Sequence, residues 1–391
     1  MSHAAVGRTA GRRRGWARVV AAVAALSLVV VACGAEQESV AGDGADEDSP
    51  GEEEAADSGE VFELRFANFL GPQAAQILAM RWWAEQVEER TDGRVTVEFF
   101  DGGSLLAAGD TLPGIGDGRA EMGHVAHFYH PGELPLSTVS ELPFMVANPQ
   151  VQARVFNQLY RDSEEFRGEW EAMGVHVLHF NPSGVVILGS EDPIVTPEDL
   201  QGRQVRAVGY AARALDAVGA NPQALEAPEI YESMQRGLID SYSSFPFEVI
   251  TAFQLQEVAP YVADPGLGNY LLTAAPISLS MWEAMPDDIR QILTEVSEEL
   301  LDDAVWDIYA DVEDAVCDAI VEAGGEVTVF TDDDVSAWQD QLGPEFLDEW
   351  LDNVATDRGS AEQFLDDYRT ALDVHSEDAD FDSGVRRCAG L

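Results

Sequence analysis

The chain alternates between two hydrophobic periods. Residues 62–69 (FELRFANF) place apolar side chains at every second position, which predicts a strand with one buried face. Residues 73–93 carry apolar side chains on one side of a helical repeat, and Gly93 ends the predicted helix. Residues 94–100 (RVTVEFF) return to the strand pattern. Strand, helix and strand in this order predict a parallel sheet covered by helices, an α/β fold.

A second series of similar elements follows. Residues 120–129 and 174–180 are predicted strands, and residues 183–190 begin the second series. The segment 196–202 (TPEDLQG) has a threonine suited to a helix N-cap, a proline suited to the first turn and a closing glycine. It leads into residues 203–209 (RQVRAVG), a further predicted strand.

Residues 286–325 are predicted to form one helix of unusual length. At ~1.5 Å per residue it would be roughly 55 Å long, more than the width of one domain. We therefore expect this helix to bridge two lobes or to run along both. Its apolar stripe consists of Ile289, Leu293, Val296, Leu300, Val305, Ile308, Val312 and Val316.

The charge of the chain limits its partners. The 391 residues, enough for about two domains, include 22 basic residues, all arginines, against 72 acidic ones. Five of these arginines precede residue 19, so the chain beyond carries a formal charge of −55. Such a surface repels phosphate backbones and anionic lipid headgroups, so we expect no binding to nucleic acid or to a membrane surface by the folded body. Solubility is the simplest reason for the charge, and a salty environment would screen the self-repulsion.

Residues 1–32 are predicted to be a signal peptide. Three arginines at 12–14 precede an apolar run at 19–32 that is too short to remain as a membrane-spanning helix. The run ends in VVAC, which resembles a lipobox and predicts lipidation of Cys33 as the new N-terminus. An ordinary secretory signal cleaved nearby is the alternative. The arginines also resemble a twin-arginine signal, so the export route stays open.

Residues 33–59 follow as a predicted tether. Between residues 34 and 59 the segment carries ten acidic residues and no arginine, and it lacks the apolar side chains needed for a core. This composition predicts a disordered connection between a lipid anchor and the folded body. Calcium binding by the carboxylates is the alternative, but no loop of the known calcium-binding type is present.

The two remaining cysteines, Cys317 and Cys388, leave two possibilities. In an exported chain they could form one disulfide that joins the C-terminal tail to a helix. They could equally be two separate thiols, because no spacing rule selects the pairing.

Catalytic and metal-binding motifs are weak. The sequence has no nucleophile elbow, phosphate loop, dinucleotide fingerprint or zinc-protease helix, so we expect neither an enzyme nor a cofactor. His124, His127 and His130 lie three residues apart, and residues at that spacing on a strand face opposite sides. We therefore expect packing or cleft-lining histidines in place of a metal site, and the same holds for His176 and His179.

Arg206 is the strongest candidate for binding. The neighbouring Val205 and Ala207 face one side of the predicted strand, so Arg206 projects from the other. It lies near the C-terminal end of that strand, where open α/β sheets bind ligands. A surface arginine paired with one of the many carboxylates is the alternative that the residues alone leave open.

Several motifs together resemble one family. Residues 189–209 and 218–244 are similar to the dicarboxylate-receptor type of solute receptor from tripartite ATP-independent periplasmic (TRAP) transporters. In that family a PEDLKGLKIRV run is followed by LGA.P and by an EVY.ALQ.G..DG helix. The further segments that resemble it are 89–106, 118–123, 141–145 and 282–293, so the resemblance covers about residues 60 to 350.

The resemblance implies a two-lobed fold of the periplasmic-binding-protein type II, with the long helix spanning both lobes. It implies a first lobe made of residues 60–184 and 270–308. It assigns residues 185–269 and 309–391 to the second lobe. The lobes would close on a small organic acid, with no chemical reaction and no metal.

The resemblance also implies a set of site residues. Arg206 matches the arginine that forms a bidentate salt bridge to the ligand carboxylate. Many members carry a second ligand-facing arginine where this chain has Val186, so we expect a less acidic ligand, such as a monocarboxylate with an apolar or aromatic portion. Ser244 and Phe245 fall at a further ligand contact. Two more residues, Phe69 and His127, lie where the first lobe would line the cleft, although packing in the core is an equal alternative for both.

The function implied is that of an exported receptor, periplasmic or lipid-anchored on the outer face of the cytoplasmic membrane. It would deliver its ligand to the small and large membrane subunits of a TRAP transporter, with membrane attachment only through the N-terminal lipid. A ligand sensor for a signalling partner and a secreted enzyme on a similar scaffold are the alternatives. The sequence does not select the organic acid.

Overall fold

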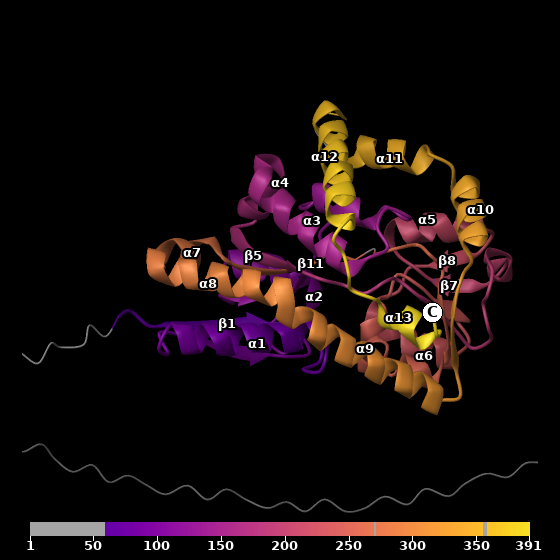
Figure 1. The fold of residues 1–391 in the computed structure, drawn as a ribbon, viewed down its shortest axis with the longest axis horizontal. Coiled ribbons are helices and arrows are strands. Elements are labelled where there is room, and N and C mark those ends of the chain that lie inside the picture. The colour runs from indigo at the N-terminus through magenta and orange to yellow at the C-terminus, as the bar shows by residue number, and fades with distance from the viewer. Residues whose placement is uncertain (1–58, 270, 355–357) are drawn as a thin grey trace, which may run out of the picture. The chain divides into compact units, whose positions relative to one another are not determined.

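The computed structural model describes residues 59–269, 271–354 and 358–391. The predicted signal peptide, Cys33 and all but the last residue of the predicted tether lie outside the described residues. The described part of the chain forms two lobes, each built around a six-stranded sheet with helices packed against it (Figure 1). This arrangement confirms the predicted two-lobed α/β class.

The sheet of the first lobe has the order β2-β1-β3-β11-β4, and β5 pairs with β11. Parallel pairing of β1 with β2 joins Phe62 to Val95 and continues to Ala67 and Phe100. The alternation of apolar and polar residues explains why this segment forms a strand with one buried face. Phe62, Leu64 and Phe66 of β1 are buried, while the residues between them are at least partly exposed. Its strands are β1 (Phe62–Ala67), β2 (Val95–Phe100), β3 (Met122–Gly123), β4 (Val125–Ala126), β5 (Val175–Asn181) and β11 (Thr273–Ser278).

Apart from the long helix at 287–322, five helices of the described residues belong to the first lobe by sequence position. They are α1 (Ala75–Arg90), α2 (Ala108–Gly116), α3 (Pro149–Asp162), α4 (Glu164–Ala172) and α7 (Leu279–Ala284). The predicted helix 73–93 corresponds to α1, which buries Ala79, Met80 and Trp83 in the core. Gly93 follows the helix with a φ of 76°, a left-handed conformation that suits glycine.

The sheet of the second lobe has the order β12-β10-β6-β9-β7-β8. Its strands are β6 (Leu188–Ser190), β7 (Gln204–Arg206), β8 (Asn221–Gln223), β9 (Ser241–Tyr242), β10 (Tyr261–Asp264) and β12 (Glu326–Val329). Its helices are α5 (Gly209–Ala217), α6 (Ile230–Gln235), α10 (Asp332–Leu342) and α13 (Gly384–Cys388). The strand β7 lies between β8 and β9 and is parallel to both.

Short 3₁₀ turns connect many of these elements. They are η1 (His127–Tyr129), η2 (Leu136–Glu141), η3 (Pro197–Leu200), η4 (Ala227–Glu229), η5 (Phe247–Val249), η6 (Thr251–Phe253) and η7 (Leu255–Glu257). The predicted capped turn before β7 corresponds to η3. There the side chains of Thr196 and Asp199 form a capping box, and Gly202 closes the turn with a φ of 82°. This turn fixes the start of the strand that carries Arg206.

The long predicted helix is present and spans both lobes. It consists of α8 (Asp287–Glu299), a π-helical turn at Leu300–Ala304 (η8) and α9 (Val305–Glu322). Val305 and Tyr309 belong to the first lobe's core, whereas Val316 and Ile320 belong to the second lobe's core. In Figure 1 the two helices follow each other as one orange rod that passes from α1 to the region of α6 and α13.

The C-terminal part of the chain differs from the predicted assignment of residues 309–391 to the second lobe. The helices α11 (Glu345–Val354) and α12 (Arg358–Ser376) pack on the first lobe (Figure 1). Trp350 of α11 donates a 3.0 Å hydrogen bond to the Thr138 hydroxyl, and the Phe364 ring of α12 lies 5.4 Å from that of Phe166. The apolar face of α12 is buried against α3 and α4, and that of α11 against η2. No local sequence pattern specifies these partners.

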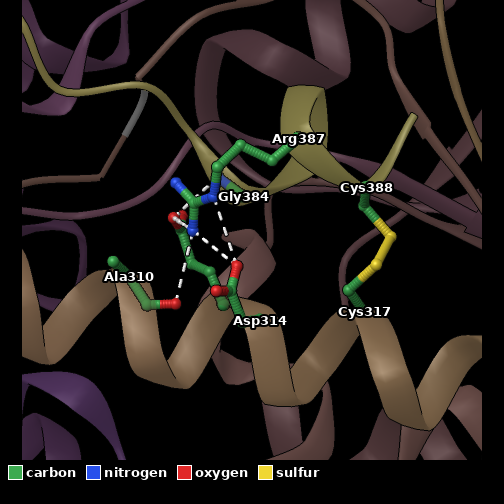
Figure 2. The surroundings of a disulfide bond; sticks show 7 residues. Ala310, Asp314, Cys317, Gly384, Arg387 and Cys388 are labelled. Carbon is green, nitrogen blue, oxygen red and sulfur yellow. Dashed lines mark hydrogen bonds and ion pairs between the residues drawn. A yellow bond between two sulfur atoms is a disulfide. The ribbon is translucent and has the colours of Figure 1, made fainter. Parts of the chain in front are cut away.

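The last helix returns to the second lobe, where a disulfide links Cys317 of α9 to Cys388 of α13 (Figure 2). Of the two possibilities that the sequence left open, the structure therefore shows the bonded one. Arg387 stands beside the disulfide and donates a 2.8 Å hydrogen bond to Asp314 of α9. The backbone N–H of Gly384 donates a 2.7 Å bond to Glu313. The C-terminus is thus held on α9 by covalent, ionic and backbone contacts.

Candidate functional site: a cavity between the lobes

A cavity with a volume of about 60 Å³ is lined by residues of both lobes. It is smaller than the cavities of ~150 Å³ that admit benzene, so a ligand with a ring enters only when the lobes or their side chains move apart. The aromatic residues of its lining are Phe69, Phe128, Tyr129, Phe245 and Phe253. The polar residues are Gln76, His124, Ser183, Arg206, Ser244 and Thr273.

Arg206 is the last residue of β7 and is only 3% exposed. Its Nε donates to the carbonyl oxygen of Leu225 at 2.9 Å, and its Nη1 donates to those of Ser243 and Ser244 at 3.1 and 2.9 Å. These backbone acceptors hold the guanidinium in one orientation. Among the described residues that line the cavity, Arg206 is the one arginine.

Ser244 supports this arrangement through its backbone. Its φ of 53° is a left-handed conformation that few residues other than glycine adopt, and it marks a constrained turn. The Ser244 hydroxyl accepts from the Val208 N–H at 3.1 Å and lies 3.2 Å from the Val208 carbonyl oxygen, to which it donates. The side chain is thus already engaged, and the Ser244 carbonyl is what contacts Arg206. Ser244 therefore contacts the guanidinium through its carbonyl oxygen and not through its hydroxyl.

Phe245 and Phe69 line the cavity from opposite lobes. Phe245 is buried and makes edge contacts with Tyr242 and Phe253, with ring centroids 5.6 and 5.3 Å apart. Phe69 follows β1, and its ring lies 5.3 Å from that of His124 and 5.8 Å from that of Tyr129. The two phenylalanines therefore contribute apolar surface on either side of the space between the lobes.

His127 does not line the cavity. It is fully buried, its Nδ1 donates to the Leu272 carbonyl oxygen at 2.8 Å, and its Nε2 lies 3.1 Å from both Ser140 Oγ and Glu141 Oε1. The predicted strand stops at Ala126, and the chain turns into η1 at His127. The structure places His124 in the lining instead.

Several lining residues carried no signal in the sequence. Thr273 becomes part of the site because β11 pairs with β4, where Thr273 faces Ala126. Gln76 reaches it from α1 and donates a 2.8 Å hydrogen bond to Glu248 of the other lobe. His124 could have been found from its two-residue spacing to Ala126 in the predicted strand 120–129, because residues two apart on a strand face the same side. In the structure His124 lies between β3 and β4.

Val186, the position at which the family resemblance implies a second arginine in many members, does not contribute to the lining. Its side chain is fully buried in the second lobe's core with Leu188, Val205 and Leu271. The positive charge of the lining therefore comes from β7 alone among the described residues.

Burial keeps three of the described histidines neutral near pH 7. Desolvation lowers the pKa of His124 to about 3, and it lowers the pKa values of His176 and His179 to about 4. Within residues 59–269, 271–354 and 358–391, no three His, Cys, Asp or Glu side chains converge as a metal site would require. Over the same ranges, no helix has both the length and the apolar composition needed to cross a membrane.

Two sheet-centred lobes around a cavity with one buried arginine define a periplasmic-type binding protein for a small solute. Residues 66–350 match the model of the bacterial extracellular solute-binding protein family 7, named DctP. The chain belongs to this family, and its function is that of a solute-binding receptor for a TRAP transporter.

Individual relatives show the same likeness. The C4-dicarboxylate-binding periplasmic protein DctP of Rhodobacter capsulatus is 24% identical over 286 residues, which cover 72% of this chain and 84% of that protein. A TRAP periplasmic solute-binding protein of Desulfovibrio salexigens is 25% identical with a TM-score of 0.70, covering 82% of this chain and 98% of that structure. A TRAP solute-binding protein of Rhodoferax ferrireducens with copurified benzoate has 21% identity and a TM-score of 0.72, covering 81% and 99%.

Proposed function

We propose that this receptor captures a small monocarboxylate with an aromatic or largely apolar body and that Arg206 binds the carboxylate. The observation that carries the proposal is the position of Arg206, 3% exposed, in a lining otherwise rich in aromatic side chains. A planar guanidinium matches a carboxylate with two parallel hydrogen bonds, and a low local dielectric strengthens the pair.

Preorganisation of Arg206 supports this role. Three hydrogen bonds to backbone carbonyls, from Leu225, Ser243 and Ser244, fix the guanidinium before a ligand arrives. A long arginine side chain that is already ordered loses little further conformational freedom on binding. More of the interaction free energy then appears as affinity.

The lining favours one carboxylate over two. A second carboxylate would require a second cation, but Val186 is buried in the core and His124, with a pKa of about 3, is neutral. The similar proteins do not select the acid, because one is named for C4-dicarboxylates and another holds benzoate. The choice therefore rests on the aromatic wall of Phe69, Phe128 and Phe245.

The delivery of the ligand is the second part of the proposal. The receptor hands the acid to the small and large membrane subunits of a TRAP transporter, and it catalyses no reaction. Lipidation of Cys33 would anchor it to the outer face of the cytoplasmic membrane, with the acidic segment as a tether. Mass spectrometry of the mature N-terminus tests the anchor, since a diacylglyceryl-modified Cys33 supports it and cleavage at another residue contradicts it.

Isothermal titration with a panel of aromatic and aliphatic acids tests the carboxylate site. Arg206→Ala should weaken binding by ~3 to 5 kcal/mol, because it removes one partner of a buried charged pair. Arg203→Ala is the matched control, since Arg203 lies three residues earlier, outside the cavity lining, and its Nε donates to the Asp199 carbonyl oxygen at 2.9 Å. Unchanged affinity in Arg206→Ala, with a normal melting profile, would contradict the assignment.

A further inference from the structure

Four residues that line the cavity carry a buried polar atom without a hydrogen-bond partner among the described residues. These atoms are Gln76 Oε1, His124 Nδ1, Ser183 Oγ and Thr273 Oγ1. Buried polar atoms are rarely left unpaired, because the loss of water is not compensated. Their convergence on one cavity indicates that a ligand supplies hydrogen bonds there in addition to the carboxylate contact at Arg206.

Two of these residues form a patch on the first lobe's wall. Thr273 of β11 pairs directly with Ala126 of β4, and His124 precedes Ala126 by two residues. Directly paired residues share a face of a sheet, and His124, which lies between β3 and β4, lines the same cavity as Ala126 and Thr273. His124 and Thr273 are 1% and 6% exposed. The Phe69 ring, 5.3 Å from that of His124, borders the patch with apolar surface.

We propose that the ligand is an aromatic monocarboxylate that carries a neutral hydroxyl group and that His124 and Thr273 bind this hydroxyl. Arg206, which belongs to the other lobe, binds the carboxylate of the same molecule, so this inference rests on the proposed function. A ligand held at both ends by different lobes stabilises the closed arrangement. His124 and Thr273 then determine which acids are accepted.

A hydroxyl group fits the patch better than an anion does. It donates one hydrogen bond and accepts others, so it can pair with imidazole Nδ1 in either tautomer and with the threonine hydroxyl. The patch has no positive charge to offer a second carboxylate, because burial keeps the His124 imidazole neutral with a pKa of about 3. Gln76 already donates to the carboxyl group of Glu248, so it brings no positive charge for a second anion.

Matched pairs of ligands test the inference by isothermal titration. Benzoate is compared with 3- and 4-hydroxybenzoate, and phenylacetate with its 3- and 4-hydroxy derivatives. We expect at least one hydroxylated acid to bind about 5- to 150-fold more tightly than its parent, the range for pairing a buried polar group. Equal affinity within every pair would overturn the inference.

Two substitutions assign the preference to residues. Thr273→Val keeps the shape of the side chain, and His124→Phe keeps a ring while removing the nitrogens. Each should reduce the preference for the hydroxylated acid to about threefold or less, with little change for the parent acid. Thr370→Val is the control, because Thr370 is exposed on α12 and bonds to the Asp366 carbonyl. A preference that survives both substitutions contradicts the roles of His124 and Thr273.

The same titrations separate this inference from the proposed function. If the parent acids bind, depend on Arg206 and show no hydroxyl preference, only the hydroxyl inference fails. If no carboxylate binds, or if binding does not depend on Arg206, the proposed function fails as well. Melting profiles of each variant identify any loss of folding before affinities are compared.

Discussion

Glu248 of η5 and Glu313 of α9 bring two buried carboxyl groups to the same side of Gly184, where the chain passes from the first lobe to the second. A Cβ atom at Gly184 would lie 2.2 Å from Glu248 Oε2 and 3.4 Å from Glu313 Oε1. Glu248 accepts hydrogen bonds from the Gly184 N–H and from Gln76. Desolvation raises the pKa of Glu248 to about 7, and desolvation together with the nearby Glu248 raises the pKa of Glu313 to about 8.

These carboxyl groups predict a stability that falls as the pH rises. In the unfolded chain a glutamate titrates near ~4.3, so between that value and its raised pKa the folded state binds more protons. The free energy of unfolding should therefore decrease from about pH 6.5 to pH 8.5, a range above the ordinary histidine pKa of ~6.5. Glu169, whose pKa is also raised to about 8 by burial, adds to the slope.

Urea unfolding at several pH values in this range measures the slope. Glu313→Gln should reduce it and should raise the free energy of unfolding at pH 8.5 by about 2 kcal/mol, since the amide needs no proton. Glu322→Gln, an exposed position near the end of α9, is the control and should leave the slope unchanged. If the free energy of unfolding of the wild type is constant or rises over this pH range, the pKa values of Glu248 and Glu313 are not raised by burial.

The disulfide between Cys317 and Cys388 predicts a second stability effect. It closes a loop with a sequence separation of 71 residues, and loss of such a bond typically removes about 2–4 kcal/mol. The double variant Cys317→Ser/Cys388→Ser should therefore unfold at lower urea concentration than the oxidised protein. Reduced wild-type protein should match the variant, and a reduced protein as stable as the oxidised one would contradict the prediction.

The buried position of Val186 predicts how an arginine substitution there would affect stability and ligand affinity. Val186→Arg would place a charge in the second lobe's core beside Leu188 and Val205 and not in the cavity. We expect a loss of several kcal/mol in the free energy of unfolding and no gain in dicarboxylate affinity. Val186→Leu, a change of volume without charge, serves as the comparison for urea unfolding and titration. Tight succinate binding by a well-folded Val186→Arg protein would show that the side chain reaches the cleft.

Alternation along 203–209 predicts that Arg206 projects from the side of the strand opposite Val205 and Ala207, and the structure has Arg206 in the cavity lining. Its contact with a ligand stays a prediction. The sequence predicted the long helix too, since the apolar stripe continues across the π-helical turn. His127 illustrates a limit, because a strand that becomes a 3₁₀ turn after Ala126 moves the next histidine out of the wall. An amphipathic pattern also predicts which face of a helix is buried, but it does not predict which element packs against that face.

That limit explains the residues that sequence reasoning missed. Thr273 and Gln76 lie nearly two hundred residues apart and meet at one cavity only through tertiary packing. The placement of α11 and α12 on the first lobe has the same cause, because their apolar faces pack on η2, α3 and α4, which lie about two hundred residues earlier in the chain.

The return of the C-terminal segment has a mechanical consequence for ligand exchange. α12 is packed on the first lobe, whereas α13 is joined to α9 by the disulfide, so residues 377–383 run from one lobe to the other. Seven residues span at most ~25 Å when fully extended. Phe381 within them packs on Trp306 with ring centroids 5.0 Å apart. The length of this segment therefore sets an upper limit on how far the two lobes can separate when the solute enters or leaves.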